Sequence, residues 1–120
     1  MELDFLEPCN IDLYEWNNIY TQFIELMDNP HKFQDVLRGK VMATLFFEPS
    51  TRTMLSFQVA MQRLGGTCVG FSDPSKSSIA KGENLRDTIS VISRYVDIIV
   101  LRHPWDGAAY AASILSKAPV

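Results

Sequence analysis

The sequence predicts an α/β fold built on a doubly wound parallel sheet. Short apolar runs of strand length alternate with longer segments in which apolar residues recur every three or four positions. The first of these runs is apolar throughout, as is typical of a strand covered by helices on both faces. The connections are short, as expected for right-handed strand-helix-strand crossovers.

The first predicted helix spans Asp12 to Asp28. Apolar side chains recur there at helical spacing, and Asp12 with Glu15 forms an N-terminal capping pattern. The residues of this apolar stripe are Leu13, Trp16, Tyr20, Phe23, Ile24 and Met27. An Asn-Pro pair ends the helix, and a polar connector leads to residues 41–47, the first predicted strand.

A second helix is expected from Ser50 to Leu64, because Met54, Phe57 and Met61 share one face and two glycines follow as a stop. The second strand should cover Thr67 to Phe71. After it, the polar segment 72–82 has the composition of an exposed mobile loop.

The last third of the chain repeats the pattern. Asn84, with Asp87 three residues later, opens a helix whose core-facing residues are Leu85, Ile89, Ile92 and Val96. The third strand is predicted over Asp97 to Leu101 and an Ala-rich helix over Asp106 to Lys117. Pro119-Val120 resembles the start of another strand, so we expect one domain over residues 1–120, truncated at its C-terminus.

Composition excludes several classes of protein. The 120 residues are 47% hydrophobic with a net charge of −3, which argues against nucleic-acid binding through a broad basic face. Neither a signal peptide nor a membrane span is visible, and Cys9 and Cys68 do not form a disulfide framework. We therefore expect a cytoplasmic protein with no membrane partner.

Ligands bind such sheets beyond the carboxyl ends of the strands, and all three turns at that edge hold hydroxyls or cations. The residues are Ser50, Thr51, Arg52 and Thr53 after the first strand, Lys76, Ser77, Ser78 and Lys81 after the second, and Arg102 and His103 after the third. A small anion with several negative charges is the simplest ligand for this edge.

The turn after the first strand is the most informative. A helix that opens with Ser-Thr-Arg-Thr offers free N–H groups, the positive end of its dipole, hydroxyls and a guanidinium suited to phosphate. Plain structural interpretations stay open at each position. Ser50 could simply cap the helix, Lys81 could be a solvated lysine, and Arg102 could be exposed or paired with Glu48.

Common catalytic and phosphate-binding motifs are missing from the sequence. It contains neither GxxxxGK[ST] nor GxGxxG, and neither His31 nor His103 lies near a nucleophile in the chain. A histidine beside a proline after a strand, as at position 103, is expected to be structural. The two histidines and two cysteines suggest no metal site, and no cofactor is expected.

Five segments resemble one known family, the aspartate/ornithine carbamoyltransferases. They are Phe-Phe-Glu-Pro-Ser-Thr-Arg-Thr at 46–53, Ser-Phe-Gln at 56–58, Lys-Gly-Glu at 81–83, Asp-Thr at 87–88 and Arg-His-Pro at 102–104. The Glu-Pro before Ser-Thr-Arg-Thr and the Arg-His-Pro are similar to the aspartate branch. The resemblance covers the carbamoyl-phosphate-binding portion and implies that the aspartate-binding domain is absent from this chain.

The resemblance implies an enzyme that transfers a carbamoyl group from carbamoyl phosphate to L-aspartate, an early step of pyrimidine biosynthesis. Ser50, Thr51, Arg52 and Thr53 would then bind the phosphate, and Thr53 and Arg102 would reach the carbonyl oxygen. Loop 72–82, with Lys81 and either Ser77 or Ser78, would enter the site of a neighbouring subunit in a homotrimer. Arg52, Thr53, Lys81 and Arg102 would be the catalytic residues.

Two features of the sequence depart from the family pattern. Met54 stands where the family often has a basic residue, and family chains are roughly 300 residues long, so we expect residues 1–120 alone to be inactive with aspartate. Three alternatives stay open on the sequence: a noncatalytic phosphate- or anion-binding module, an ornithine-type carbamoyltransferase, and an α/β domain that binds no ligand.

Overall fold

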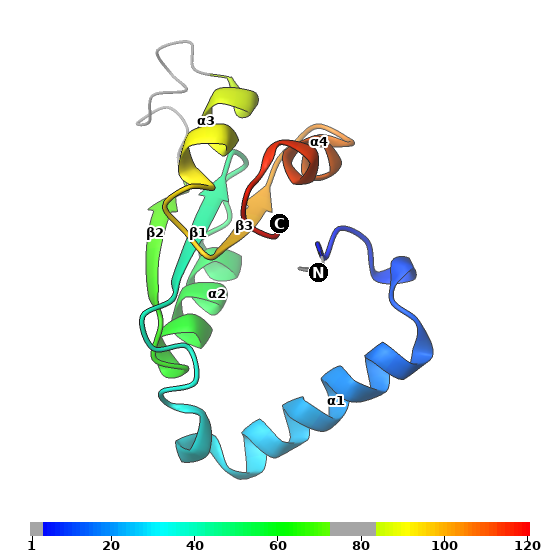
Figure 1. The fold of residues 1–120 in the computed structure, drawn as a ribbon, viewed down its shortest axis with the longest axis vertical. Helices are drawn as coiled ribbons and strands as arrows, with labels where there is room; N and C mark the ends of the chain where they lie inside the picture. Colours follow the sequence, from blue (N-terminus) through cyan, green and yellow to red (C-terminus); the bar gives the residue numbers. More distant parts are fainter. Residues whose placement is uncertain (1–3, 73–83) are drawn as a thin grey trace.

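The structure is a computed structural model and describes residues 4–72 and 84–120. The described residues contain a three-stranded parallel sheet in the order β2-β1-β3 (Figure 1). Its strands are β1 (Val41–Phe46), β2 (Thr67–Phe71) and β3 (Ile98–Arg102). The predicted parallel α/β sheet is confirmed, with the first strand of the sequence in the centre.

Helices cover both faces of the sheet. Ala43 and Leu45 of β1 pack on one face with Ile89 of α3 (Leu85–Ile92) and Ala112 of α4 (Ala108–Leu115). On the other face, Gln58 of α2 (Thr51–Arg63) donates to Thr44 Oγ1 at 3.1 Å. Successive residues of a strand point to opposite faces, so odd-numbered β1 residues face α3 and α4 and even-numbered ones face α2. Helices on both faces make the sheet doubly wound.

The central strand is buried as predicted, because residues 42–46 are all buried and lie between two layers of helix. The bounds of α2 and β2 agree with the prediction to within one residue. The third strand instead begins at Ile98 and extends to Arg102. Its pairing with β1 continues at the carboxyl end, because Phe46 pairs with Arg102 and the Phe47 N–H donates to the Arg102 carbonyl at 2.8 Å.

Two of the predicted helices are shorter than expected. The predicted helix over 106–117 starts only at Ala108, because Gly107 has a φ of 77° in the left-handed region, and it ends before Ser116, which is extended. The helix that opens at Asn84 ends at Ile92. Beyond it, N–H groups donate to the carbonyl three residues earlier, which tightens the last turn. Val96 still packs against the core, although it lies beyond the helix.

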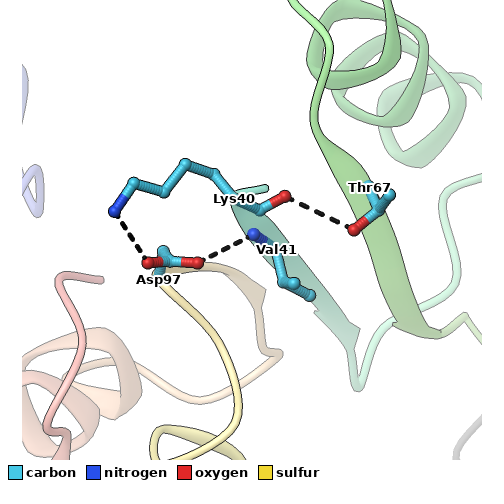
Figure 2. Close-up of polar contacts among 4 residues, drawn as sticks. All are labelled: Lys40, Val41, Thr67 and Asp97. Carbon is cyan, nitrogen blue, oxygen red and sulfur yellow. Dashed lines mark hydrogen bonds and ion pairs between the residues drawn. The ribbon is translucent and has the colours of Figure 1, made fainter. Parts of the chain in front are cut away.

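The amino ends of the three strands are joined by one polar network (Figure 2). Asp97, just before β3, accepts from the Val41 N–H at 2.8 Å and from Lys40 Nζ at 3.1 Å, and its own N–H donates to the Val41 carbonyl. On the other side, Thr67 donates to the Lys40 carbonyl from both its N–H and its hydroxyl. This network fixes the register of the sheet and therefore aligns the opposite ends of the strands.

One glycine in the sheet allows a close backbone approach. Gly70 of β2 has a φ of 141°, and a Cβ at this position would lie 2.0 Å from the Thr44 carbonyl oxygen of the central strand. An alanine here would have to displace the backbone of β1. The tight contact between β2 and β1 therefore requires glycine at position 70.

The first helix, α1 (Leu13–Asp28), lies apart from the sheet (Figure 1). Its predicted capping box is present, since Asp12 accepts from the Glu15 N–H and Glu15 accepts from the Asp12 N–H. Within the described parts of the chain its apolar stripe is mostly exposed: Trp16 meets the Phe5 ring at 6.3 Å between centroids, but Leu13 is 76% exposed. The sequence pattern predicted the helix correctly but did not show what lies against it.

The first described residues of the chain lie close to its C-terminal end (Figure 1). The Phe5 N–H donates to the Val120 carbonyl, and the Ile99 N–H of β3 donates to the Pro119 carbonyl, both at 2.9 Å. No strand is assigned to residues 119 and 120, so the start of a strand at Pro119-Val120 stays a prediction. The hydrogen bond from Ile99 nevertheless places these residues beside β3.

Candidate functional site

The parallel register brings the carboxyl ends of all three strands to one edge of the sheet. Phe46 near the end of β1 pairs with Arg102 of β3, and Leu45 pairs with Phe71 of β2. The turns that follow the strands therefore begin side by side, as the sequence predicted. This edge is the candidate site.

The turn after β1 leads into the N-terminus of α2. Ser50 is the N-cap residue by position, but its hydroxyl makes no capping hydrogen bond and instead donates to Thr53 Oγ1 at 2.9 Å. The first N–H groups of a helix have no partner within the helix. Those of Thr51, Arg52 and Thr53 are thus not taken by the Ser50 hydroxyl, and the interpretation of Ser50 as a simple cap is wrong.

Arg102 and the first turn of α2 belong to the same side of the sheet. Thr44, two residues before Phe46, faces α2 through its bond with Gln58, so Phe46 and its partner Arg102 also point to the α2 side. Arg52 lies in the first turn of α2 and is exposed. The structure therefore places both predicted arginines at one end and on one face of the sheet.

Arg102 forms an ion pair in this structure. Its Nε donates to Glu48 Oε2 at 3.3 Å. The Arg102 side chain is 42% exposed and the Glu48 side chain 48% exposed. The sequence left open an arginine paired with Glu48, and this pairing is observed. An exposed pair in water is weak, so the guanidinium keeps most of its capacity to bind another anion.

The remaining predicted site residues lie in the turn after β2. Lys76, Ser77, Ser78 and Lys81 lie outside the described residues, as does nearly all of the predicted loop 72–82. Of the proposed site, the structure thus describes Ser50, Thr51, Arg52, Thr53 and Arg102.

His103 takes part in packing that sequence reasoning did not foresee. Its ring lies 4.9 Å from that of Phe47 and 5.2 Å from that of Trp105, between centroids. His103 Nδ1 accepts from the Trp105 N–H at 3.0 Å. Burial lowers the pKa of His103 and favours the neutral ring that this hydrogen bond needs. The prediction that His103 has a structural role is confirmed by this packing. The aromatic residue Phe47, just after the first strand, was the sequence signal from which the contact could have been predicted.

A search for other kinds of site gave two further findings. Among residues 4–72 and 84–120, no three His, Cys, Asp or Glu side chains gather as ligands for a metal ion would. Over the same residues, none of the helices combines the length and apolar character needed to cross a membrane.

A cavity of about 500 Å³ lies at the opposite end of the sheet. Its lining is mostly apolar and includes Met42, Met61 and Ile98, with Lys40, Asp97 and Lys117 as the charged members. A doubly negative small molecule needs several convergent donors, whereas this lining is mostly apolar and its Lys40 is paired with Asp97. The carboxyl edge of the strands is thus the better candidate.

Residues 4–120 match the family model described as aspartate/ornithine carbamoyltransferase, carbamoyl-P binding domain. A curated relative, the aspartate carbamoyltransferase catalytic subunit of Clostridium perfringens, is 50% identical over 115 residues. The match covers 96% of this chain but 38% of the relative. The chain therefore spans well under half the length of this relative.

Solved structures give the same result. The catalytic subunit of M. jannaschii aspartate transcarbamoylase is 47% identical with a TM-score of 0.87, covering 97% of this chain and 40% of that one. Aspartate transcarbamoylase from Trypanosoma cruzi, in complex with carbamoyl phosphate and aspartate, is 39% identical with a TM-score of 0.73. The match covers 88% of this chain and 34% of that one. The chain therefore belongs to the carbamoyl-phosphate-binding domain family of the aspartate/ornithine carbamoyltransferases.

Proposed function

We propose that this chain binds carbamoyl phosphate at the carboxyl edge of its sheet and that the protein containing it transfers the carbamoyl group to L-aspartate. The products are N-carbamoyl-L-aspartate and phosphate, and the reaction belongs to pyrimidine biosynthesis. The observation that carries this proposal is the position of Arg102 on the same face and at the same end as the uncapped N-terminus of α2, in a member of this family.

The proposed phosphate ligands are Ser50, Thr51, Arg52 and Thr53. The helix N-terminus supplies N–H groups and positive potential, and the planar guanidinium of Arg52 can donate two parallel hydrogen bonds to phosphate oxygens. The Ser50–Thr53 hydrogen bond supports this proposal because it holds two hydroxyls together at the helix start.

Arg102 is proposed to join these phosphate ligands and, with Thr53, to reach the carbonyl oxygen of the carbamoyl group. Attack by the neutral amine of aspartate forms the C–N bond and places negative charge on that oxygen. The C–O bond to phosphate then breaks, the phosphate leaves with the bond's electron pair, and the amine loses a proton. Fixed donors and cations stabilise this charge, and losing one such group typically costs a few kcal/mol.

Several finer features are also part of this proposal. Lys81 and Ser77 or Ser78 would complete the site on a loop from a neighbouring subunit of a homotrimer, and Lys81 would add positive charge beside the phosphate. A cytoplasmic location is proposed as well. The curated relatives named as aspartate carbamoyltransferases support aspartate rather than ornithine as the acceptor.

The direct test is an activity assay on the complete reading frame that contains residues 1–120, with aspartate and ornithine offered together. We expect carbamoylated aspartate and free phosphate in equal amounts. Formation of carbamoylated ornithine alone, or of neither product, would refute the proposed reaction. The 120-residue chain assayed in parallel should give no product, because the aspartate-binding domain is proposed to lie outside it.

A further inference from the structure

An aromatic row links the carboxyl ends of all three strands. The Phe71 ring, at the end of β2, meets the Phe47 ring edge to face at 5.3 Å between centroids. Phe47, just after β1, then contacts His103, just after β3, at 4.9 Å, and His103 contacts Trp105 at 5.2 Å. We call Phe71, Phe47, His103 and Trp105 the aromatic row. It joins the starts of the three turns that make up the candidate site.

The row supports the site from the opposite face of the sheet. Phe47 and Phe71 pack against the buried cluster that includes Ala43 and Leu45, on the side of α3 and α4. Arg102 points to the α2 side. The aromatic row is thus placed to hold the strand ends without occupying the face where the anion is proposed to bind.

His103 is the member of the row closest to Arg102 along the chain. The Phe47 N–H donates to the Arg102 carbonyl at 2.8 Å, so backbone and ring contacts join the same two strand ends. On its other side, His103 Nδ1 accepts from the Trp105 N–H and closes a tight turn directly after Arg102. A side-chain acceptor for the N–H two residues later is the arrangement of an Asx turn.

We propose that His103 is a positioning residue for the anion site: its Nδ1 acceptor fixes the turn after β3 and thereby the direction of the Arg102 side chain. This inference rests on the proposed function, because it assumes that Arg102 faces the bound anion. His103 itself does not touch the ligand. Two properties therefore have to be separated in a test, the hydrogen-bond acceptor and the ring packing.

The test compares His103→Phe with His103→Asn in the complete protein that contains residues 1–120, with inorganic phosphate as the titrated probe. Phenylalanine keeps a ring against Phe47 but has no acceptor, whereas asparagine keeps an acceptor at the place of Nδ1 but has no ring. We expect His103→Phe to weaken phosphate binding about tenfold and His103→Asn to stay within about twofold of wild type.

The outcomes separate the inference from the proposed function. Wild-type protein that binds no phosphate contradicts the proposed function itself. If wild type binds phosphate and His103→Phe binds it with the same affinity, the positioning role is overturned. The role is also overturned if His103→Phe and His103→Asn lose affinity equally. Melting temperatures of all variants show that they are folded during the titration, and His103→Leu, which also lacks the acceptor, replaces His103→Phe if that variant does not fold.

Discussion

Arg102 Nε donates to Glu48 Oε2 at 3.3 Å, which joins the last residue of β3 to the turn after β1. Both side chains are more than 40% exposed, at 42% and 48%, so the pair contributes little to folding stability. Its importance is electrostatic, because the Glu48 carboxylate lies beside the guanidinium that an incoming phosphate group would use and competes weakly with that group.

Glu48→Gln should strengthen phosphate binding. The change removes a competing negative charge beside Arg102, and an exposed ion pair worth up to about 1 kcal/mol corresponds to a gain of roughly two- to fivefold. Calorimetric titration at low salt measures the effect, which should shrink as salt is added. Glu25→Gln is the matched control, since Glu25 pairs with Lys32 far from the site and its loss should leave affinity unchanged. Weaker phosphate binding by Glu48→Gln would contradict the competition.

Arg52→Ala should remove most phosphate binding with little change in folding stability. A charged hydrogen bond is worth about 1.5–3 kcal/mol, so affinity should fall at least about tenfold. Arg52 is exposed in the first turn of α2, and its truncation leaves no cavity. Arg63→Ala, at the other end of the same helix, is the control and should bind normally. Equal phosphate affinity in Arg52→Ala and wild type would reject the assigned role.

Gly70→Ala should destabilise the fold strongly. Its Cβ would meet the Thr44 carbonyl oxygen of the neighbouring strand at 2.0 Å, so we expect a loss of about 3 kcal/mol or more. Gly39→Ala is the control, because Gly39 also has a positive φ but lies in open space and should lose only about 1–2 kcal/mol. Denaturant unfolding of both variants measures the difference. Similar losses at the two positions would show that the close approach has no effect.

Asp97 should make folding stability dependent on acid pH. The Val41 N–H, and next Lys40, lower the pKa of Asp97 below its ordinary value of 3.8. The carboxylate therefore stabilises the fold fully above pH 3.8, and this contribution is lost as the pH falls through the lowered folded-state pKa. The stability difference between wild type and Asp97→Asn should be constant near neutral pH and shrink in acid. Unfolding curves at several pH values measure it, and a difference that grows in acid would contradict the sign.

Much of the fold could be predicted from local sequence signals. The apolar run at 41–47 indicated a doubly covered strand, and Asp12 with Glu15 and Asn84 with Asp87 marked helix starts that the structure confirms. Helix ends were harder to predict, because they depend on single backbone conformations such as the left-handed Gly107.

The candidate site was predictable in its residues but not in its contacts. Parallel strands bring their carboxyl ends together, which is why Arg52 and Arg102 could be assigned to one edge. Whether Ser50 capped the helix, or Arg102 met Glu48, depended on side-chain geometry that spacing does not encode. The network of Lys40 and Asp97 was missed because its partners lie far apart in the chain.

The central claim is that the first turn of α2 and Arg102 together bind the phosphate group of carbamoyl phosphate. Amide NMR of the ¹⁵N-labelled 120-residue chain, titrated with freshly prepared carbamoyl phosphate, tests this claim residue by residue. We predict saturable shifts that are largest at Thr51, Arg52, Thr53 and Arg102. Saturable shifts confined to the amino ends of the strands, around Lys40 and Asp97, or no saturable shift at all, would contradict it.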